Sequence, residues 1–161
     1  MKWCNRLTNV NGLKNVHTLD LSHCENIEDV SPLGNVYKLN LSHTNVTDVS
    51  SLGNVYDLNL SHTNVIDVSR LGRVHSLNLN YCKKLVDVSS LVNVTILRLM
   101  GCRRIVDVSM LSNVVYLDIR GCWRLRTNIS TLKNKKLISN YSNDIEISSN
   151  NDNDDVSNDI I

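Results

Sequence analysis

Residues 36–54, VYKLNLSHTNVTDVSSLGN, return almost unchanged as residues 55–73, VYDLNLSHTNVIDVSRLGR. Related units open at Val16, Val74, Val94 and Val114. The first three of these have 20 residues instead of 19, and the last begins well and then departs from the pattern. A short period carried through six units predicts a solenoid, in which each unit packs only against its neighbours.

The two unit lengths differ in the turn that follows the predicted strand. In a 19-residue unit, Thr44 is followed two positions later by Val46. In a 20-residue unit, Cys24 is followed three positions later by Ile27. The extra residue therefore falls in a turn, where it disturbs no pairing between strands.

These two patterns resemble the repeat cores of the leucine-rich-repeat family, L-x-x-L-x-L-x-x-N-x-L and L-x-x-L-x-L-x-x-C-x-x-L. The D-V-S-x-L-x-N that follows them is similar to the short-repeat, internalin-like or SDS22-like branch. The near-identical S-H-T-N-V-x-D-V-S units also resemble repeat gene families of large DNA viruses. The resemblance implies a right-handed superhelical solenoid, with a parallel β-sheet on the concave face and 3₁₀ or short turns on the convex face.

We expect three parts along the chain. Residues 1–15 form an N-terminal half-repeat or cap, residues 16–137 form six repeats with the last one degraded, and residues 138–161 form an acidic, disordered tail rich in Asn, Ser and Asp. Because the first unit begins in mid-repeat, either Trp3 covers that end or an open terminal strand allows self-association.

The physical chemistry of the repeat agrees with this fold. The L-x-L alternation has period two and predicts a short strand with one face buried. The stretch from Asp48 to Asn54 is shorter than an average α-helix of about 11 residues and predicts a 3₁₀ turn. We expect Ser50 to be its N-cap and Asp48 to cap backbone donors, as in the other repeats. Pro32, the only proline, falls at the first helical position, which tolerates it.

Composition limits the core and the location of the chain. There is no Phe, so the core is built from Leu, Val and Ile. No apolar run follows Met1 and no stretch of about 18 apolar residues occurs, so we expect neither a signal peptide nor a membrane span. We therefore expect the protein in the cytoplasm, or in the host cytoplasm if it is viral, where thiols stay reduced.

The sequence offers no catalytic site, metal site or cofactor site. The five cysteines recur at one repeat position, without a C-x-x-C pair, and are predicted to be small buried residues rather than metal ligands or disulfides. Aspartates spaced every 19–20 residues indicate a structural row rather than a catalytic pair. No nucleophile elbow or phosphate-binding loop occurs, so we expect no enzyme activity.

The positions that alternate with the buried leucines should point to the concave face, where a repeat protein varies in order to bind. The row expected to contribute most contains aromatic rings with polar tips: His17, Tyr37, Tyr56 and His75. A second row, at the strand end, contains His23, His43, His62 and Tyr81. Its three imidazoles could bind a metal or sense pH, but no acidic or cysteine partner recurs beside them, so a solvated row or a partner contact is favoured. The remaining candidates on this face are Lys38, Asp57, Arg98 and Arg120.

Charge is distributed unevenly along the chain. Residues 73–136 carry twelve basic and three acidic side chains, whereas residues 137–161 carry no basic and six acidic ones. Part of this basic excess recurs in the turn after the strand and should form an edge stripe: Lys83, Lys84, Arg103, Arg104, Arg124 and Arg126. Such a stripe suits an acidic partner, nucleic-acid phosphate or plain solvation, and the acidic tail could screen it.

The sequence therefore predicts a non-catalytic module that binds another protein through its concave face. One concrete alternative is an adaptor for a host ubiquitin ligase, although no F-box precedes the G-C-R-R-I and G-C-W-R-L segments. The other is a binder of nucleic acid or another anion through the basic stripe. Nucleic acid is the less favoured partner, because few aromatic side chains for base stacking lie near that stripe.

Overall fold

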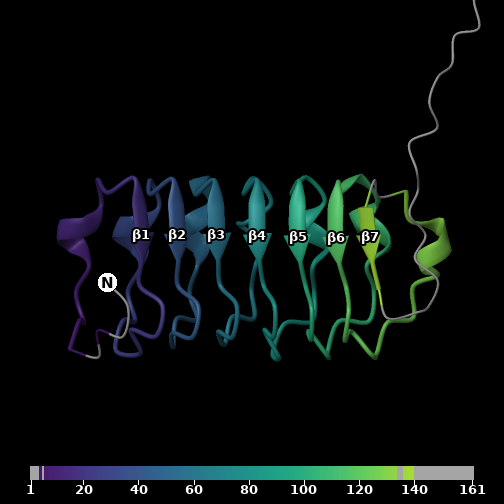
Figure 1. The fold of residues 1–161 in the computed structure, drawn as a ribbon, viewed down its shortest axis with the longest axis horizontal. Coiled ribbons are helices and arrows are strands. Elements are labelled where there is room, and N and C mark those ends of the chain that lie inside the picture. The colour runs from purple at the N-terminus through teal and green to yellow at the C-terminus, as the bar shows by residue number, and fades with distance from the viewer. Residues whose placement is uncertain (1–3, 5, 134–135, 140–161) are drawn as a thin grey trace, which may run out of the picture.

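The computed structural model describes residues 4, 6–133 and 136–139 of the 161-residue chain. Seven short parallel strands form one sheet in chain order (Figure 1). The strands are β1 (Thr18–Asp20), β2 (Lys38–Asn40), β3 (Asp57–Asn59), β4 (Ser76–Asn78), β5 (Ile96–Arg98), β6 (Tyr116–Asp118) and β7 (Lys136–Ile138). This is the predicted leucine-rich-repeat solenoid.

Single 3₁₀ turns run behind the sheet, as the short loops predict. They are η1 (Asn11–Leu13), η2 (Ser31–Leu33), η3 (Ser50–Asn54), η4 (Ser89–Leu91), η5 (Ser109–Asn113) and η6 (Ile129–Thr131). In Figure 1 the row of turns spreads wider than the sheet, with η6 lying beyond β7. The sheet is therefore the inner, concave side of the solenoid.

The register of the sheet places each repeat position beside the same position of the next repeat. Leu39 pairs with Leu58, and Lys38 pairs with Asp57. The core follows directly from this register. The leucines at the centre of β1–β6 form one buried column, the residues two positions later form a second, and valines and leucines of the turns close the convex side.

Aspartate, and not serine, satisfies the first backbone donor of most turns. The residue at the N-cap is a valine, such as Val49, and no side-chain capping bond is made there. Instead the Asp48 carboxylate accepts a hydrogen bond from the Ser50 backbone N–H at 2.9 Å, and the other four repeat aspartates do the same. The predicted aspartate cap is confirmed, and the predicted serine N-cap is wrong because Ser50 is already the first residue of the turn.

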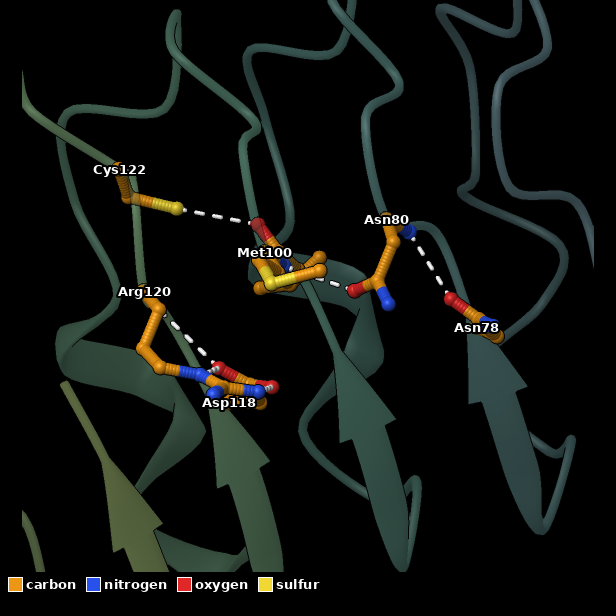
Figure 2. Close-up of polar contacts among 7 residues, drawn as sticks. Asn78, Asn80, Met100, Asp118, Arg120 and Cys122 are labelled. Atoms are coloured by element: carbon orange, nitrogen blue, oxygen red, sulfur yellow. Dashed lines mark hydrogen bonds and ion pairs between the residues drawn. The ribbon is translucent and has the colours of Figure 1, made fainter.

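Four cysteines of the cysteine column are buried, as predicted, whereas Cys4 is partly exposed. Three of the buried thiols link neighbouring repeats. The Cys102 thiol donates to the Leu79 carbonyl of the preceding repeat at 3.0 Å. The Cys122 thiol, drawn in Figure 2, donates to the Leu99 carbonyl at 3.1 Å. Thr63, in the same column, instead bonds the Leu60 carbonyl of its own repeat at 2.6 Å. All five cysteines are thiols.

A seventh strand follows the repeats that the sequence makes obvious. Asn134 stands where earlier repeats open with valine, yet Leu137 keeps the central leucine and pairs with Leu117. Trp3 and the tail from residue 140 onward, with the expectations about a plug and a disordered segment, lie outside the described residues. Within the described chain, no helix is long and apolar enough to cross a membrane.

Candidate functional site

Four aromatic rings stack across the entrances of the first four strands. We call His17, Tyr37, Tyr56 and His75 the entry ladder; each residue directly precedes its strand. Successive ring centroids lie 4.7, 4.7 and 4.5 Å apart, with interplanar angles of 10° or less. The side chains of Tyr37 and Tyr56 remain 45% and 42% exposed, so this ladder is part of the solvent-facing surface.

The stacking follows from the sheet itself. Parallel in-register strands lie about 4.8 Å apart, which is also a suitable distance for stacked rings. Identical positions in successive repeats therefore stack without any further adjustment. The sequence predicted that these four side chains share a row, and the structure adds that each ring covers the face of the next.

A second set of four rings stacks beyond the other end of the same strands. We call His23, His43, His62 and Tyr81 the exit ladder. Their centroids lie 4.3, 4.1 and 4.6 Å apart, with interplanar angles of 9°, 14° and 26°. Five residues, three of them in the strand, separate the two ladders in each repeat, so the ladders lie within about 20 Å of each other and flank the sheet face between them.

The exit ladder stands on a left-handed backbone. The φ angles of His23, His43, His62 and Tyr81 are 61°, 57°, 60° and 59°. In the next two repeats the same position is glycine, with φ of 74° at Gly101 and 72° at Gly121. A side chain in this region costs about 1–2 kcal/mol, although His is enriched there among non-glycine residues. The first four repeats thus keep a ring at a position where glycine is the easier choice.

Two members of the exit ladder favour the neutral imidazole. Burial lowers the pKa of His43, and the nearby His23 lowers it further. Burial also lowers the pKa of His62, with added effects from His43 and Lys83. Both groups therefore lose their proton more readily than a histidine in solution. His43 and His62 therefore present mainly uncharged ring edges at neutral pH.

The floor between the ladders is polar and internally bonded. Lys38 and Asp57 form an ion pair of 2.8 Å across β2 and β3. The Asn40 side chain accepts from the Ser42 backbone N–H at 3.0 Å, and Asn78 accepts from Asn80 in the same way (Figure 2). This row of side chains fixes the corner at which each strand leaves the sheet. The sequence pattern had placed them only as an outward row, although an Asx residue two positions before a corner is a known turn former.

The two arginines predicted on this face, Arg98 and Arg120, both contact other side chains of the protein. Arg120 makes a two-pronged contact with Asp118, through Nε at 2.9 Å and a terminal nitrogen at 2.7 Å (Figure 2). Arg98 lies over one ring, that of Tyr116, at 5.3 Å from its centroid, and Lys136 lies 5.8 Å from the same centroid. The sequence did not anticipate either arrangement, because both depend on side-chain conformation and on the packing of neighbouring strands.

The predicted basic residues lie exposed on the turns that leave β4, β5 and β6. Lys83 and Lys84 follow Cys82, Arg103 and Arg104 follow Cys102, and Trp123 and Arg124 follow Cys122. None of these five cations forms an ion pair with another described residue. Arg126 lies farther along its turn, where its backbone N–H donates to Val106 at 2.8 Å.

The chemistry available to the exit ladder is hydrogen bonding and not metal binding. Nearly parallel stacked imidazoles direct their nitrogens side by side and not toward a common point. Metal ligands must converge at about 2.0–2.1 Å on one ion. In the part of the chain that the structure describes, no group of three His, Cys, Asp or Glu side chains could hold a metal ion.

Comparisons with known proteins give structural neighbours only. No protein-family model matches the sequence, and no curated protein matches it. Among solved structures, the internalin InlF of Listeria monocytogenes has a TM-score of 0.59 at 24% identity, over 81% of this chain and 49% of that one. Internalin C2 of the same organism has a TM-score of 0.53 at 21% identity, over 83% and 57%.

A third structural neighbour comes from the same organism. A functional domain of InlJ from Listeria monocytogenes, described as including a cysteine ladder, has a TM-score of 0.53 at 18% identity, over 78% of this chain and 34% of that one. This chain thus spans less than three fifths of each of these structures. The likeness gives no support to the resemblance to viral repeat families. At these identities the neighbours establish one thing, that this chain has the leucine-rich-repeat solenoid fold seen in the internalins.

Proposed function

We propose that this protein is a non-catalytic interaction module that binds another protein through the concave face of its sheet. The observation that carries the proposal is the pair of ring ladders flanking β1–β4. Aromatic side chains are enriched where proteins bind one another, because a rigid ring buries much area with little loss of freedom. The half-exposed rings of Tyr37 and Tyr56 lie at the centre of the entry ladder.

The backbone strain of the exit ladder supports the same proposal. Strained residues persist where the surrounding structure holds them, and they gather at sites of function. Glycine at this position in two later repeats indicates that the fold itself does not require a ring there. The rings of His43 and His62 are best explained as contacts for a partner, together with the ion-paired Lys38 and Asp57 on the floor.

Two finer expectations accompany the proposal. Buried thiols suit a reducing compartment, which supports a cytoplasmic location. Self-association through the first repeat, where Leu7 and Leu13 are only partly buried, is a separate possibility that light scattering at increasing concentration would reveal. We do not extend the proposal to a ubiquitin-ligase adaptor, since the described repeats carry no feature that points to a ligase.

Affinity capture with quantitative mass spectrometry tests the proposal. The double variant Tyr37→Ala/Tyr56→Ala removes the centre of the entry ladder. We expect it to lose partners that the wild type retains, because a central aromatic anchor contributes about 2 kcal/mol or more to an interface. If the variant captures the same proteins in the same amounts, the concave face is not the binding surface.

The matched control removes two large apolar side chains that are at least as exposed, elsewhere on the surface. Ile66 and Met110 are 61% and 56% exposed, in the loop between β3 and β4 and in η5. The Ile66→Ala/Met110→Ala variant should capture the wild-type partners. Thermal unfolding followed by circular dichroism verifies that both double variants are folded, so that a loss of capture reports binding.

A further inference from the structure

The five cations that leave β4, β5 and β6 form no ion pair with a described residue. The nearest carboxylates along the chain, Asp87 and Asp107, lie three residues beyond Lys84 and Arg104 and accept hydrogen bonds from the Ser89 and Ser109 backbone N–H groups. We call Lys83, Lys84, Arg103, Arg104 and Arg124 the cationic rim. All five are exposed, and residues 79–86, 99–106 and 119–133 contain no Asp or Glu. Because successive strands are about 4.8 Å apart, like charges of neighbouring repeats are held well within a Debye length of about 8 Å. This repulsion lowers the stability of the folded state, so the cationic rim does not contribute to holding the fold together.

The same repeat position carries different chemistry in the earlier repeats. Where later repeats have Lys83 and Arg103, the earlier ones have Glu25, Asn45 and Asn64. The Asn45 side chain donates to the Glu25 backbone carbonyl at 2.9 Å, so this position can form a hydrogen-bonded row that is acidic at Glu25 and neutral at Asn45 and Asn64. The positive row is thus a property of the second half of the solenoid and not a requirement of the turn.

The cationic rim continues the exit ladder. Lys83 follows Tyr81, the last ring of the ladder, by two residues, and Arg103 follows Gly101 by the same interval. The edge where the strands end therefore offers imidazole edges over the first repeats and cations over the later ones. Both groups form hydrogen bonds with carboxylates, and the cations form the stronger, charge-assisted ones.

We infer that the edge formed by the exit ladder and the cationic rim binds an acidic polypeptide segment of the partner. This inference deepens the proposed function and rests on it in one respect, namely that the partner is a protein. Carboxylates supply the charge that the rim lacks, and a chain laid along the edge meets five cations and then ring edges in sequence.

Nucleic acid is a poorer fit to the same edge. Binding of single strands relies on ring faces that are free to stack on bases. In the exit ladder the faces of His43 and His62 are covered by their neighbours at 4.1–4.6 Å, which leaves only ring edges. Among the described residues of the three turns that carry the rim, Trp123 has the one exposed aromatic ring. A polypeptide carboxylate needs no ring face.

Fluorescence anisotropy with a labelled oligoglutamate peptide tests the inference at neutral pH and roughly physiological ionic strength. The variant Lys83→Gln/Lys84→Gln/Arg103→Gln/Arg104→Gln removes four of the five rim cations. We expect it to bind oligoglutamate at least about 10-fold more weakly than the wild type, because the variant removes several exposed ion pairs with the peptide at once. The His43→Gly/His62→Gly variant should weaken binding about 3-fold or more, since it removes two neutral hydrogen-bonding edges.

The matched control removes the same charge from other exposed positions. The variant Lys14→Gln/Arg70→Gln/Arg73→Gln/Lys133→Gln should bind oligoglutamate within about 2-fold of the wild type, because these cations lie outside the rim. Equal weakening in both quadruple variants, no binding by the wild type, or tighter binding of oligothymidine than of oligoglutamate would each overturn the inference. None of these results bears on the Tyr37/Tyr56 capture experiment, so the proposed function fails or stands separately.

Discussion

The ring of Tyr81 fills the space that a side chain on Gly101 would need. An ideal Cβ built on Gly101 would lie 2.5 Å from Cδ1 and 2.7 Å from Cε1 of that ring. Gly101 also has a left-handed backbone, with φ of 74°. The exit ladder ends at this residue for a steric reason, because the last ring lies over a position that has no side chain.

Replacing Gly101 by Ala should therefore destabilise the fold in two ways. The left-handed backbone costs about 1–2 kcal/mol, and the clash with the Tyr81 ring adds about 1–3 kcal/mol. In a Tyr81→Ala background only the first cost remains, because the ring has been removed. Urea unfolding of the four proteins in this cycle measures the coupling directly. Identical destabilisation in both backgrounds would show that the ring moves aside freely.

Two substitutions at His43 separate strain from recognition. Glycine relieves the left-handed strain, but it increases the freedom of the unfolded chain, so the free energy of unfolding of His43→Gly should lie within about 1 kcal/mol of the wild-type value. Alanine removes the ring and keeps the strain, so His43→Ala should be less stable than His43→Gly by about 1 kcal/mol.

Both His43 variants lack the imidazole and should lose partner binding to the same extent. Chemical denaturation measures the free energy of unfolding of the two variants, and capture of the partner measures their binding. A His43→Gly protein that is far less stable than the wild type would show that the ring is there for the fold. In that case the strain argument for a binding role fails.

The sequence was sufficient for the fold because every strand repeats one pattern. The period placed Leu39 beside Leu58, and the register then determines which side chains share a row. The prediction missed what depends on the exact path of the backbone. The left-handed corner at His43 could have been suspected from Gly101 and Gly121 in the same column, since glycine commonly marks positive φ.

The candidate site was predicted as rows of residues and not as a set of contacts. The pattern contains no direct indication that Arg120 is held by Asp118, because that contact depends on side-chain conformation. The sequence pattern also could not identify which residue caps each turn. Asp48 and Ser50 are both good N-cap residues, and only the geometry shows that the aspartate accepts the backbone hydrogen bond.

The buried cysteines should resist alkylation in the folded protein. Burial raises the pKa of the Cys122 thiol to about 11, and burial likewise raises the pKa values of Cys82 and Cys102. The thiolate is the reactive form, so a raised pKa and burial both slow the reaction. Iodoacetamide at mildly alkaline pH should label Cys4 first, because it alone is partly exposed.

Mass spectrometry of peptides from native and urea-unfolded protein provides the measurement. We expect all five cysteines to react once the chain is unfolded, and a Cys4→Ser variant to lose the fast phase of the native reaction. Rapid labelling of Cys102 in the native protein would indicate that the cysteine column opens readily, contrary to the buried, bonded thiols described above.

The pH dependence of stability should show two separate decreases on acidification. His43 and His62 have lowered pKa values in the folded protein, so below about 6.5 the unfolded chain binds more protons than the folded one. The free energy of unfolding must then rise with pH in this range and fall as pH drops through the lowered folded values. The protein should lose stability as the pH falls below about 6.5 and through the lowered folded pKa values of His43 and His62.

A second decrease belongs to the aspartates of the turns. Hydrogen bonds from the Ser50 and Ser69 backbone N–H groups lower the pKa values of Asp48 and Asp67, so their stabilisation disappears as pH falls below about 4. His43→Asn/His62→Asn should abolish the first decrease and leave the second, because Asn tolerates the left-handed backbone and does not titrate. Asp67→Asn should reduce only the second. Urea unfolding across this pH range distinguishes the two, and a first decrease that survives in the double asparagine variant would assign it to groups outside the exit ladder.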